Sequence, residues 1–233
     1  MNLISIDENY LDYMRNNGDA RIPYMDYGIG HIKPFFVLFD LNDDISYVTQ
    51  LSSYKPRHSA IHDHLDFHKV WINKNTCKAV VNLNYMFPIL KTNYFELNRD
   101  DIKRIKERGN YSNHQINNYM NMLDKESEFI SQSNICDCAK ALYELKKDEP
   151  SHIISLRSLD FKNMEAKMIE FELTQIYDKD DFIVQYVQEE SSFIIEAPNI
   201  ENIRFNELGD VKGLMQQVDC AMNASINEYS FEK

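Results

Sequence analysis

Cysteine is scarce in this sequence, and its distribution excludes a disulfide framework. The 233 residues include four cysteines, which are too few and too scattered to staple a chain of this length. The spacing Cys136-Asp137-Cys138 is too tight for an ordinary zinc knuckle. We therefore interpret four side chains as reduced thiols that contribute mostly to packing: Cys77, Cys136, Cys138 and Cys220.

Long apolar runs are absent as well. No segment reaches the roughly 20 apolar residues that a membrane-spanning helix needs. The N-terminal stretch MNLISIDENYLDYMR carries acids where a secretory signal would carry bases, and it has no apolar core. No internal repeat or low-complexity tract is found. With 43% hydrophobic and 27% charged residues, we expect a globular, cytoplasmic protein with no membrane contact.

Basic charge is in deficit, since the formal net charge is −12. Such a deficit argues against a nucleic-acid partner, because phosphate binding normally needs a basic surface. The acids are unevenly distributed, however: residues 1–150 hold 18 basic and 21 acidic side chains, whereas residues 151–233 hold 7 and 16. Residues 55–108 hold 11 basic and 6 acidic side chains. A local basic face is therefore available, although a solvated surface of mixed charge explains the same counts.

Short strands are predicted for the first 97 residues. The apolar run Phe35–Phe39, the turn residues Asn42–Asp44 and the strand formers of Ser46–Leu51 predict a hairpin. A proline at position 88 marks the last strand of the series as an edge or a bend. Further strands are expected over three segments: 66–72, 78–83 and 85–90.

Helical periodicity replaces this pattern from Asn98 onward. Asn98 is the predicted cap of a helix that ends at Gly109, and Ser112 caps a longer helix with an apolar stripe. An earlier helix is expected over Glu8–Arg15, with Asp7 as its cap. The stripe of the longer helix consists of Ile116, Tyr119, Met120, Leu123 and Ile130.

The order of strands and helices predicts the fold class and the domains. Two more helices are expected, one from Ser133 and one over 161–171, and residues 178–233 add two strands and a closing helix. Strands grouped before helices predict an α+β fold rather than a parallel sheet with crossovers. We expect one domain over residues 1–177 and an acidic C-terminal extension over residues 178–233 of unknown role. The extension could shield a basic groove, bind a protein partner or, by default, solubilise an added layer.

Three familiar motifs are incomplete in this chain. Gly28-Ile29-Gly30 lacks the third glycine and the following helix of a nucleotide phosphate loop, so we expect it to give slack before Lys33. The pair Ser52-Ser53 lacks the glycine-flanked elbow of an acyl hydrolase. The third is the segment His62–His68, which is similar to the zinc cluster of metallo-β-lactamase-like hydrolases but has its last histidine displaced by one residue. A zinc-dependent hydrolase is therefore a less favoured alternative that would use His62, His64 and His68.

One cluster combines lysines with hydroxyl groups near predicted strand ends. Lys33 precedes one predicted strand, and the run Leu51-Ser52-Ser53-Tyr54-Lys55-Pro56 ends another. Ammonium and hydroxyl groups can hold a phosphodiester and transfer protons without a metal. Taken alone, two adjacent serines are equally typical of a turn or a helix cap.

In its ordered context, this cluster resembles the ToxN/AbiQ endoribonuclease toxins of type III toxin-antitoxin systems. The resemblance covers about residues 1 to 150 and implies a compact antiparallel, partly barrelled sheet with flanking helices. It also implies metal-independent RNA cleavage with no cofactor, and inhibition by a small structured RNA antitoxin in a protein–RNA hetero-oligomer. The segments that carry it are Leu3–Ile6, Tyr10-Leu11-Asp12-Tyr13, Pro23, Lys33-Pro34-Phe35, Leu51–Pro56, Asp66-Phe67 and Asn82–Ile89.

The resemblance also assigns site residues. Tyr27 is the candidate for the family's functional tyrosine, with residues 28–32 altering its spacing from the lysine. Tyr54, Arg57 and His58 are expected to extend the RNA surface by stacking and phosphate contacts. Four further residues fall on active-site positions: Lys33, Ser52, Ser53 and Lys55.

The implied chemistry is attack of the RNA 2'-hydroxyl on the adjacent phosphorus, which leaves a 2',3'-cyclic phosphate. A lysine with a pKa of ~10.4 is a weak base at neutral pH, so Lys33 and Lys55 are expected to stabilise charge or donate protons. Ser53 is expected to donate a hydrogen bond to phosphate. The expected role is phage defence by abortive infection, with processing of the antitoxin's repeats. The alternative class is a non-catalytic RNA-binding protein on the same scaffold.

Overall fold

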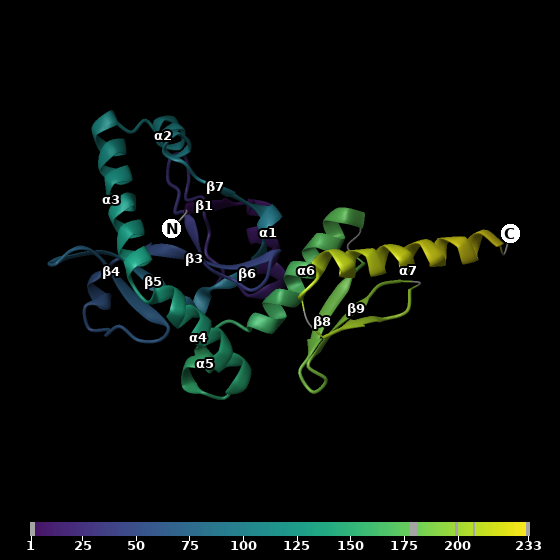
Figure 1. Ribbon diagram of the computed structural model, residues 1–233. Coiled ribbons are helices and arrows are strands. Elements are labelled where there is room, and N and C mark those ends of the chain that lie inside the picture. Colours follow the sequence, from purple (N-terminus) through teal and green to yellow (C-terminus); the bar gives the residue numbers. More distant parts are fainter. Residues whose placement is uncertain (1–2, 178–180, 199, 207, 232–233) are drawn as a thin grey trace.

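The computed structural model describes residues 3–177, 181–198, 200–206 and 208–231. Its main feature is a seven-stranded antiparallel sheet with the order β4-β5-β3-β2-β1-β7, in which β6 also pairs with β3 (Figure 1). The strands are β1 (Leu3–Ile6), β2 (Phe35–Asp40), β3 (Ile45–Ser53), β4 (Phe67–Asn73), β5 (Thr76–Asn82), β6 (Phe87–Leu90) and β7 (Tyr94–Glu96).

The sheet is open, because its outer strands β4 and β7 do not pair with each other. No sheet in the described residues closes into a barrel, so the predicted partly barrelled form is corrected here. The coarser prediction, an α+β fold built on antiparallel strands with flanking helices, is confirmed. The predicted hairpin also forms, since β2 and β3 pair across residues 41–44.

Strand β3 holds the sheet together by changing its partner along its length. Ile45–Val48 pairs with β6, whereas Leu51–Ser53 pairs with β5. Along the opposite edge, residues 46–50 pair with β2. The strand is buried from Ile45 through Leu51 and emerges from the core at Ser52 and Ser53. The end of this central strand is therefore fixed in place while its last two hydroxyl groups reach the surface.

Three helices begin at their predicted caps, whereas the helix expected from Ser133 begins at Ile135 with Asn134 as its cap. The Asn98 side chain accepts hydrogen bonds from the backbone N–H groups of residues 100 and 101, and the Ser112 side chain accepts one from Gln115. Asp7 likewise caps α1. The chain then adds two short elements that the sequence pattern did not indicate, β7 and α5. The helices of this part are α1 (Glu8–Tyr13), α2 (Arg99–Arg108), α3 (Asn113–Gln132), α4 (Ile135–Asp148), α5 (Ile153–Arg157) and α6 (Phe161–Tyr177).

Helices α2 and α3 form a separate layer over one end of the sheet. They pack on each other, and α3 also packs against β4 (Figure 1). A small apolar cluster joins them to β1, and it consists of Leu3, Ile102, Ile116, Met120 and Leu123. This second cluster fixes α3 beside the end of β3.

Helix α6 connects the main sheet with a second, three-stranded sheet. It packs against β6 on one side and β8 on the other (Figure 1). The second sheet has the order β10-β9-β8 and is followed by α7 (Val211–Phe231), which runs away from the body of the molecule. The strands are β8 (Ile183–Val187), β9 (Ser192–Glu196) and β10 (Ile203–Phe205). The two C-terminal strands and the closing helix were predicted, whereas β10 was not.

The C-terminal strands are joined to α6 by a buried carboxylate and by the core. Glu170 accepts a 2.7 Å hydrogen bond from the backbone N–H of Val184 and a 2.5 Å one from the Tyr13 hydroxyl. Apolar side chains of β8 and β9 belong to the same continuous core as those of β1 to β6. The division at residues 177 and 178, and the acidic appendage, stay predictions.

A second carboxylate of α6 lies at the centre of the core. Glu165 is 0% exposed, and its Oε1 accepts hydrogen bonds from the hydroxyls of Tyr47 (2.8 Å) and Tyr143 (2.7 Å). Its Oε2 lies 2.7 Å from Lys162 Nζ. These bonds satisfy a charge that would otherwise be strongly unfavourable in the core, and they tie α6 to β3 and α4.

We predict that Glu165→Ala lowers the free energy of unfolding by about 3 kcal/mol, the lower end for a broken buried pair, because Lys162 still reaches water. Urea denaturation of both proteins at pH 7 measures the difference. The matched control is Glu128→Ala, since Glu128 is exposed on α3 and should change stability by less than about 0.5 kcal/mol. Equal stabilities for the two variants would show that the network does not hold α6 in place.

Candidate active site

A cavity of 330 Å³ opens where β3 ends. Its walls come from four parts of the chain: the loop before β2, the paired ends of β3 and β5, helix α2 and helix α3. The residues that line it are Tyr27, His31, Ile32, Lys33, Pro34, Leu51, Ser52, Ser53, Lys78, Ala79, Lys106, Tyr119, Met122, Leu123 and Glu126. Four of the predicted site residues are therefore brought to one cavity.

The serines reach the cavity because of the β3–β5 pairing. Ser52 lies opposite Val80 and Ser53 opposite Ala79 in the antiparallel register. After Ser53 the chain turns away into a short 3-10 helix, η2 (Pro56–His58), and the sheet edge ends there. The two hydroxyl groups thus stand on backbone that is paired with β5.

The loop that carries Lys33 is held by a side chain of β3. The buried Gln50 amide donates to the carbonyl oxygens of Tyr24 (2.7 Å) and Lys33 (3.0 Å). The Lys33 N–H in turn donates to Met25 O at 3.0 Å. Since Gln50 precedes Ser52 by two residues, the strand that presents the serines also positions the lysine loop.

The glycines of this loop form a tight turn and do not give slack. Tyr27 N–H donates to His31 O, and His31 N–H donates to Gly28 O, both at 2.8 Å. Gly28 and Gly30 have positive φ values of 104° and 76°, a backbone conformation that residues with a side chain rarely adopt. A Cβ on Gly30 would lie 2.7 Å from the Gly109 Cα. The turn therefore packs against the end of α2, and the predicted slack is corrected.

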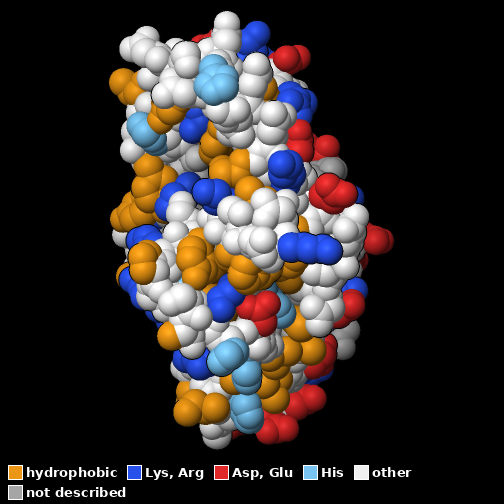
Figure 2. Space-filling model, turned by 90° about the vertical axis from the view of Figure 1, so that its left-hand side faces the viewer, with side chains coloured by type: hydrophobic (Ala, Val, Ile, Leu, Met, Phe, Trp, Pro, Cys, Tyr) orange, Lys and Arg blue, Asp and Glu red, His pale blue; other side chains and the backbone are white. Residues whose placement is uncertain are grey.

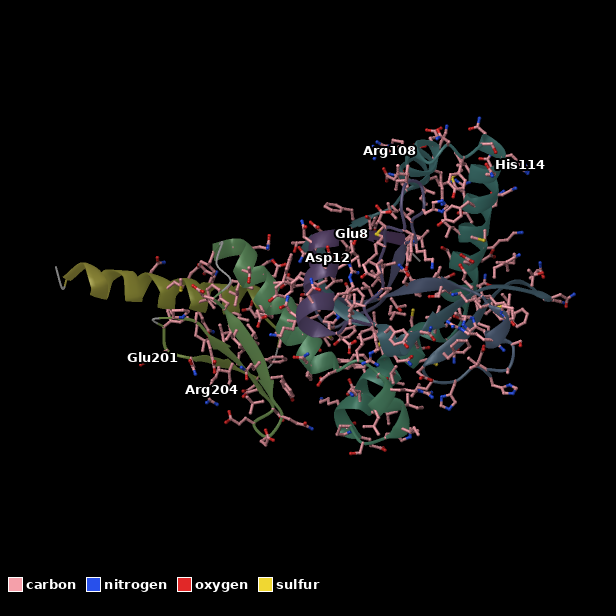
Figure 3. All side chains as sticks on the ribbon, turned by 180° about the vertical axis from the view of Figure 1, so that it is seen from behind. Glu8, Asp12, Arg108, His114, Glu201 and Arg204 are labelled. Atoms are coloured by element: carbon pink, nitrogen blue, oxygen red, sulfur yellow. The ribbon has the colours of Figure 1, made fainter. Side chains whose placement is uncertain are left out.

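Helix α1 and the π-helical turn after it, η1 (Met14–Gly18), support the other end of the loop. Glu8 Oε1 accepts a 2.9 Å hydrogen bond from the Asp26 N–H, and Arg15 Nη1 donates to Pro23 O at 3.0 Å. The Arg15 guanidinium lies over the Tyr24 ring at 3.8 Å and pairs with Glu8 and Asp12. Figure 3 shows both acids on α1. The loop is thus fixed on both sides.

Lys33 and Tyr27 contact each other inside the cavity. Lys33 Nζ lies 4.4 Å from the centre of the Tyr27 ring, which is a cation–π contact. Burial, and then the positive charge of Lys55, lower the pKa of Lys33. Burial raises the pKa of Tyr27. A lysine with a lowered pKa gives up its proton more readily near neutral pH, so Lys33 suits a proton donor.

Two charged residues of the helical wall were not predicted. Lys106 of α2 is 5% exposed; its Nζ donates to Gly30 O at 2.8 Å and lies 4.0 Å from the Tyr119 ring centre. Glu126 of α3 is 3% exposed, and burial raises its pKa to about 7. Glu126 could have been recognised from the sequence, because this charged residue occupies a position of the apolar stripe of α3, three residues after Leu123.

The remaining predicted residues lie at the rim. Lys55 and Arg57 are exposed and Tyr54 is half-buried, and none of the three lines the cavity. His58 is 6% exposed; its Nδ1 accepts a hydrogen bond from the Lys55 N–H at 3.1 Å, and its ring packs on Phe67. Burial, followed by Arg57, lowers its pKa. This placement makes His58 part of the turn rather than of an open surface.

The histidine-rich segment does not form a metal centre. His62 and His64 are exposed, while His68 is buried. The carboxylate of Asp66 is bonded to the Arg157 guanidinium at 2.5 and 2.6 Å. Within the described residues, which include all of 62–68, no group of three His, Cys, Asp or Glu side chains can hold a metal ion. The zinc alternative is therefore not supported by the arrangement of its own residues.

The surface around this end of the molecule carries mixed charge. Figure 2 shows Lys and Arg side chains over the middle of this face, while Asp and Glu gather mainly along one edge. Arg108 and His114 lie at the end of α2 and the start of α3, far from Glu201 and Arg204 at the opposite end (Figure 3). Among the described helices, none is long and apolar enough to cross a membrane.

The fold is similar to that of solved bacterial toxins. One structure, from work on selective toxin inhibition by a non-coding RNA pseudoknot in type III systems, is 20% identical with a TM-score of 0.58, over 73% of this chain and 97% of that chain. A second, from a bacterial antiviral system regulated by a processed non-coding RNA, is 22% identical with a TM-score of 0.55, over 73% and 99%.

A third similar structure is AbiQ, a lactococcal anti-phage endoribonuclease of a type III system, which is 16% identical with a TM-score of 0.51 over 74% of this chain and 98% of that chain. No curated protein matches this sequence. The sequence profile of the family described as "Toxin ToxN, type III toxin-antitoxin system" matches residues 2–169. This match spans well over half of the sequence, and the chain therefore belongs to the ToxN toxin family of type III toxin-antitoxin systems.

Proposed function

We propose that this protein is an endoribonuclease toxin that cleaves RNA without a metal ion. The observation that carries the proposal is the convergence of Lys33, Ser52 and Ser53 on one cavity in a chain of the ToxN family. The AbiQ structure, which has the same fold, belongs to an endoribonuclease. The cavity supplies ammonium and hydroxyl groups that fit a phosphodiester.

The groups of the cavity match the requirements of RNA transesterification. The 2'-oxygen forms a bond to phosphorus while the bond to the 5'-oxygen breaks, so negative charge increases on the phosphate oxygens. The Ser53 and Ser52 hydroxyls donate hydrogen bonds to these oxygens, and Lys33 gives its proton to the departing 5'-oxygen. The products are a 2',3'-cyclic phosphate and a 5'-hydroxyl.

The rim residues extend this site along the RNA strand. Lys55 is exposed and lies close enough to Lys33 to lower its pKa, so its charge attracts the same phosphate or the next one. Tyr54 offers a ring for base stacking and Arg57 a guanidinium for phosphate. We assign no RNA contact to His58, because its ring is buried below the turn.

A small structured RNA is the proposed inhibitor. In one similar system the toxin is selectively inhibited by a non-coding RNA pseudoknot, and in another a processed non-coding RNA regulates the antiviral system. An RNA that is both substrate and product of the toxin can stay bound across the basic rim after cleavage. We therefore propose that the protein processes a tandem-repeat RNA, forms an inactive protein–RNA hetero-oligomer with it, and acts in phage defence by abortive infection.

We predict that Ser53→Ala lowers kcat by about 10²- to 10³-fold, because it removes a hydrogen-bond donor to the developing phosphate charge. Lys33→Met should lower kcat by about 10²- to 10⁴-fold through loss of the proton donor. Gel-based cleavage of total cellular RNA measures both effects. Ser59→Ala and Lys74→Met are matched controls, since both residues are exposed outside the cavity. If all four variants cut at the wild-type rate, the cavity is not the active site.

We predict that cleavage continues at the wild-type rate in excess EDTA and that the 5' fragments end in 2',3'-cyclic phosphate. The physical reason is that the Lys33 ammonium and the serine hydroxyls stabilise the phosphate charge that a metal would otherwise stabilise. Mass spectrometry identifies the ends. Loss of activity in EDTA with recovery in zinc would instead favour a zinc-dependent reaction at the histidines of residues 62–68.

We predict that a tandem-repeat RNA encoded next to the toxin gene restores growth of cells that express the active protein. The RNA should be recovered bound to the protein and cut into single repeats, whereas Ser53→Ala should bind it uncut. Northern blotting and size-exclusion chromatography test both points. Tight RNA binding by the wild type with no cleavage of any RNA would favour the non-catalytic alternative.

A further inference from the structure

A carboxylate lies in the cavity where the proposed reaction still lacks a proton acceptor. Glu126 is on α3, and its side chain lines the same cavity as Lys33, Ser52 and Ser53, which come from the sheet side. Helix α3 therefore brings a carboxylate to the same space as the ammonium and hydroxyl groups of the sheet side. A phosphodiester bound to the sheet side has the helix wall as its other neighbour.

Glu126 is the one charged residue in the buried stripe of α3. The residue is 3% exposed, it follows Leu123 and precedes Ile130 in the buried stripe of α3, and the described residues give it no salt bridge. An unpaired buried carboxylate costs folding free energy, whereas a leucine at this position would add to the core. The titratable or charged groups that share the cavity with it are Tyr27, His31, Lys33, Lys78, Lys106 and Tyr119.

Three of the other titratable groups of the cavity, Lys106, Tyr27 and Tyr119, are less suited to accept a proton, and the ring of a fourth, His31, is hydrogen-bonded to the Tyr111 hydroxyl at 3.0 Å. Lys106 is bonded to Gly30 O and covered by the Tyr119 ring. Burial raises the pKa values of Tyr27 and Tyr119, so both phenols stay protonated. Burial also raises the pKa of Glu126 to about 7, the range in which a carboxylate is both ionised and appreciably basic at neutral pH.

We propose that Glu126 is the general base of the reaction, a role that rests on the proposed ribonuclease function. Its carboxylate takes the proton of the RNA 2'-hydroxyl as the 2'-oxygen bonds to phosphorus. The phosphorus–5'-oxygen bond breaks, and the 5'-oxygen receives its proton from Lys33. Glu126 ends protonated and Lys33 neutral, and exchange with water restores both. No other reactant is consumed.

The pH dependence follows from these two groups. The base form of Glu126 accumulates as the pH rises through about 7, so the rate rises with it. The acid form of Lys33 is lost at higher pH, through a pKa that is lower than that of a free lysine, so the rate then falls. The expected profile of kcat/KM is a bell whose ascending limb belongs to Glu126.

The test compares Glu126→Gln with the wild type on a single-stranded RNA oligonucleotide that the wild type cuts, between about pH 5 and 9. Glu126→Gln should lower kcat/KM by about 10²- to 10⁴-fold at pH 8 and lose the ascending limb. Glu126→Asp should cleave more slowly than the wild type but keep the limb. Glu128→Gln makes the same charge change on an exposed position of the same helix and should match the wild type.

Two further measurements separate the base role from folding and from binding. The affinity for the oligonucleotide with a 2'-deoxy group at the cut site should be the same for Glu126→Gln and the wild type. Difference infrared spectroscopy, wild type minus Glu126→Gln, should show one carboxyl that titrates near pH 7. A titration near the ordinary glutamate pKa of about 4.3 would overturn the proposal.

The outcomes distinguish the two proposals. If the wild type cleaves no RNA, the ribonuclease function itself fails. If the wild type cleaves and Glu126→Gln keeps both the rate and the ascending limb, the ribonuclease function stands and the base assignment is wrong. A loss of RNA affinity equal to the loss of kcat/KM would also overturn the base role, because it would make Glu126 a group that shapes the cavity.

Discussion

The candidate site depends on the double pairing of β3. This strand is hydrogen-bonded along both edges and changes its partner from β6 to β5 near Gln50. The change of partner ends the buried part of the strand at Leu51 and brings two hydroxyl groups to the surface on rigid backbone. The Gln50 amide of the same strand also holds the loop of Lys33 in place, because it donates a hydrogen bond to the Lys33 carbonyl oxygen. Serines and lysine are therefore positioned by one strand and not by a flexible loop.

A second constraint is the low polarity of the cavity walls. Lys33, Lys106 and Glu126 each have a pKa shifted toward the neutral form, and burial is the first cause in every case. Shifts of this kind cost folding stability, because the charged forms are less favourable in the folded protein than in the unfolded chain. The same walls strengthen electrostatic interactions with a bound phosphate.

The helices show how far local signals extend. Asp7, Asn98 and Ser112 were recognised as caps because their short oxygen-bearing side chains satisfy backbone N–H groups within three residues. The three-residue strands β7 and β10 were missed, since neither presents enough alternating residues to stand out. His58 was assigned to an RNA surface from its neighbours in sequence, yet the turn at Pro56 buries its ring against Phe67. The glycines of 28–30 were taken as slack, but α2, distant in sequence, packs against them.

The sequence by itself determined the fold class, the caps, the family and the residues of the sheet side, because these depend on local periodicity and on an ordered set of motifs. It did not determine that the sheet stays open, since closure depends on which strands meet at the edges. Nor did it place Lys106 and Glu126 at the site. Lys106 lies 73 residues after Lys33, and Glu126 lies 73 residues after Ser53. Both stand on helices whose position is decided by the packing of α2, α3 and β1. The cluster of lysine and serine residues is encoded locally, whereas the carboxylate that faces it, and the burial that shifts its pKa, exist only in the folded chain.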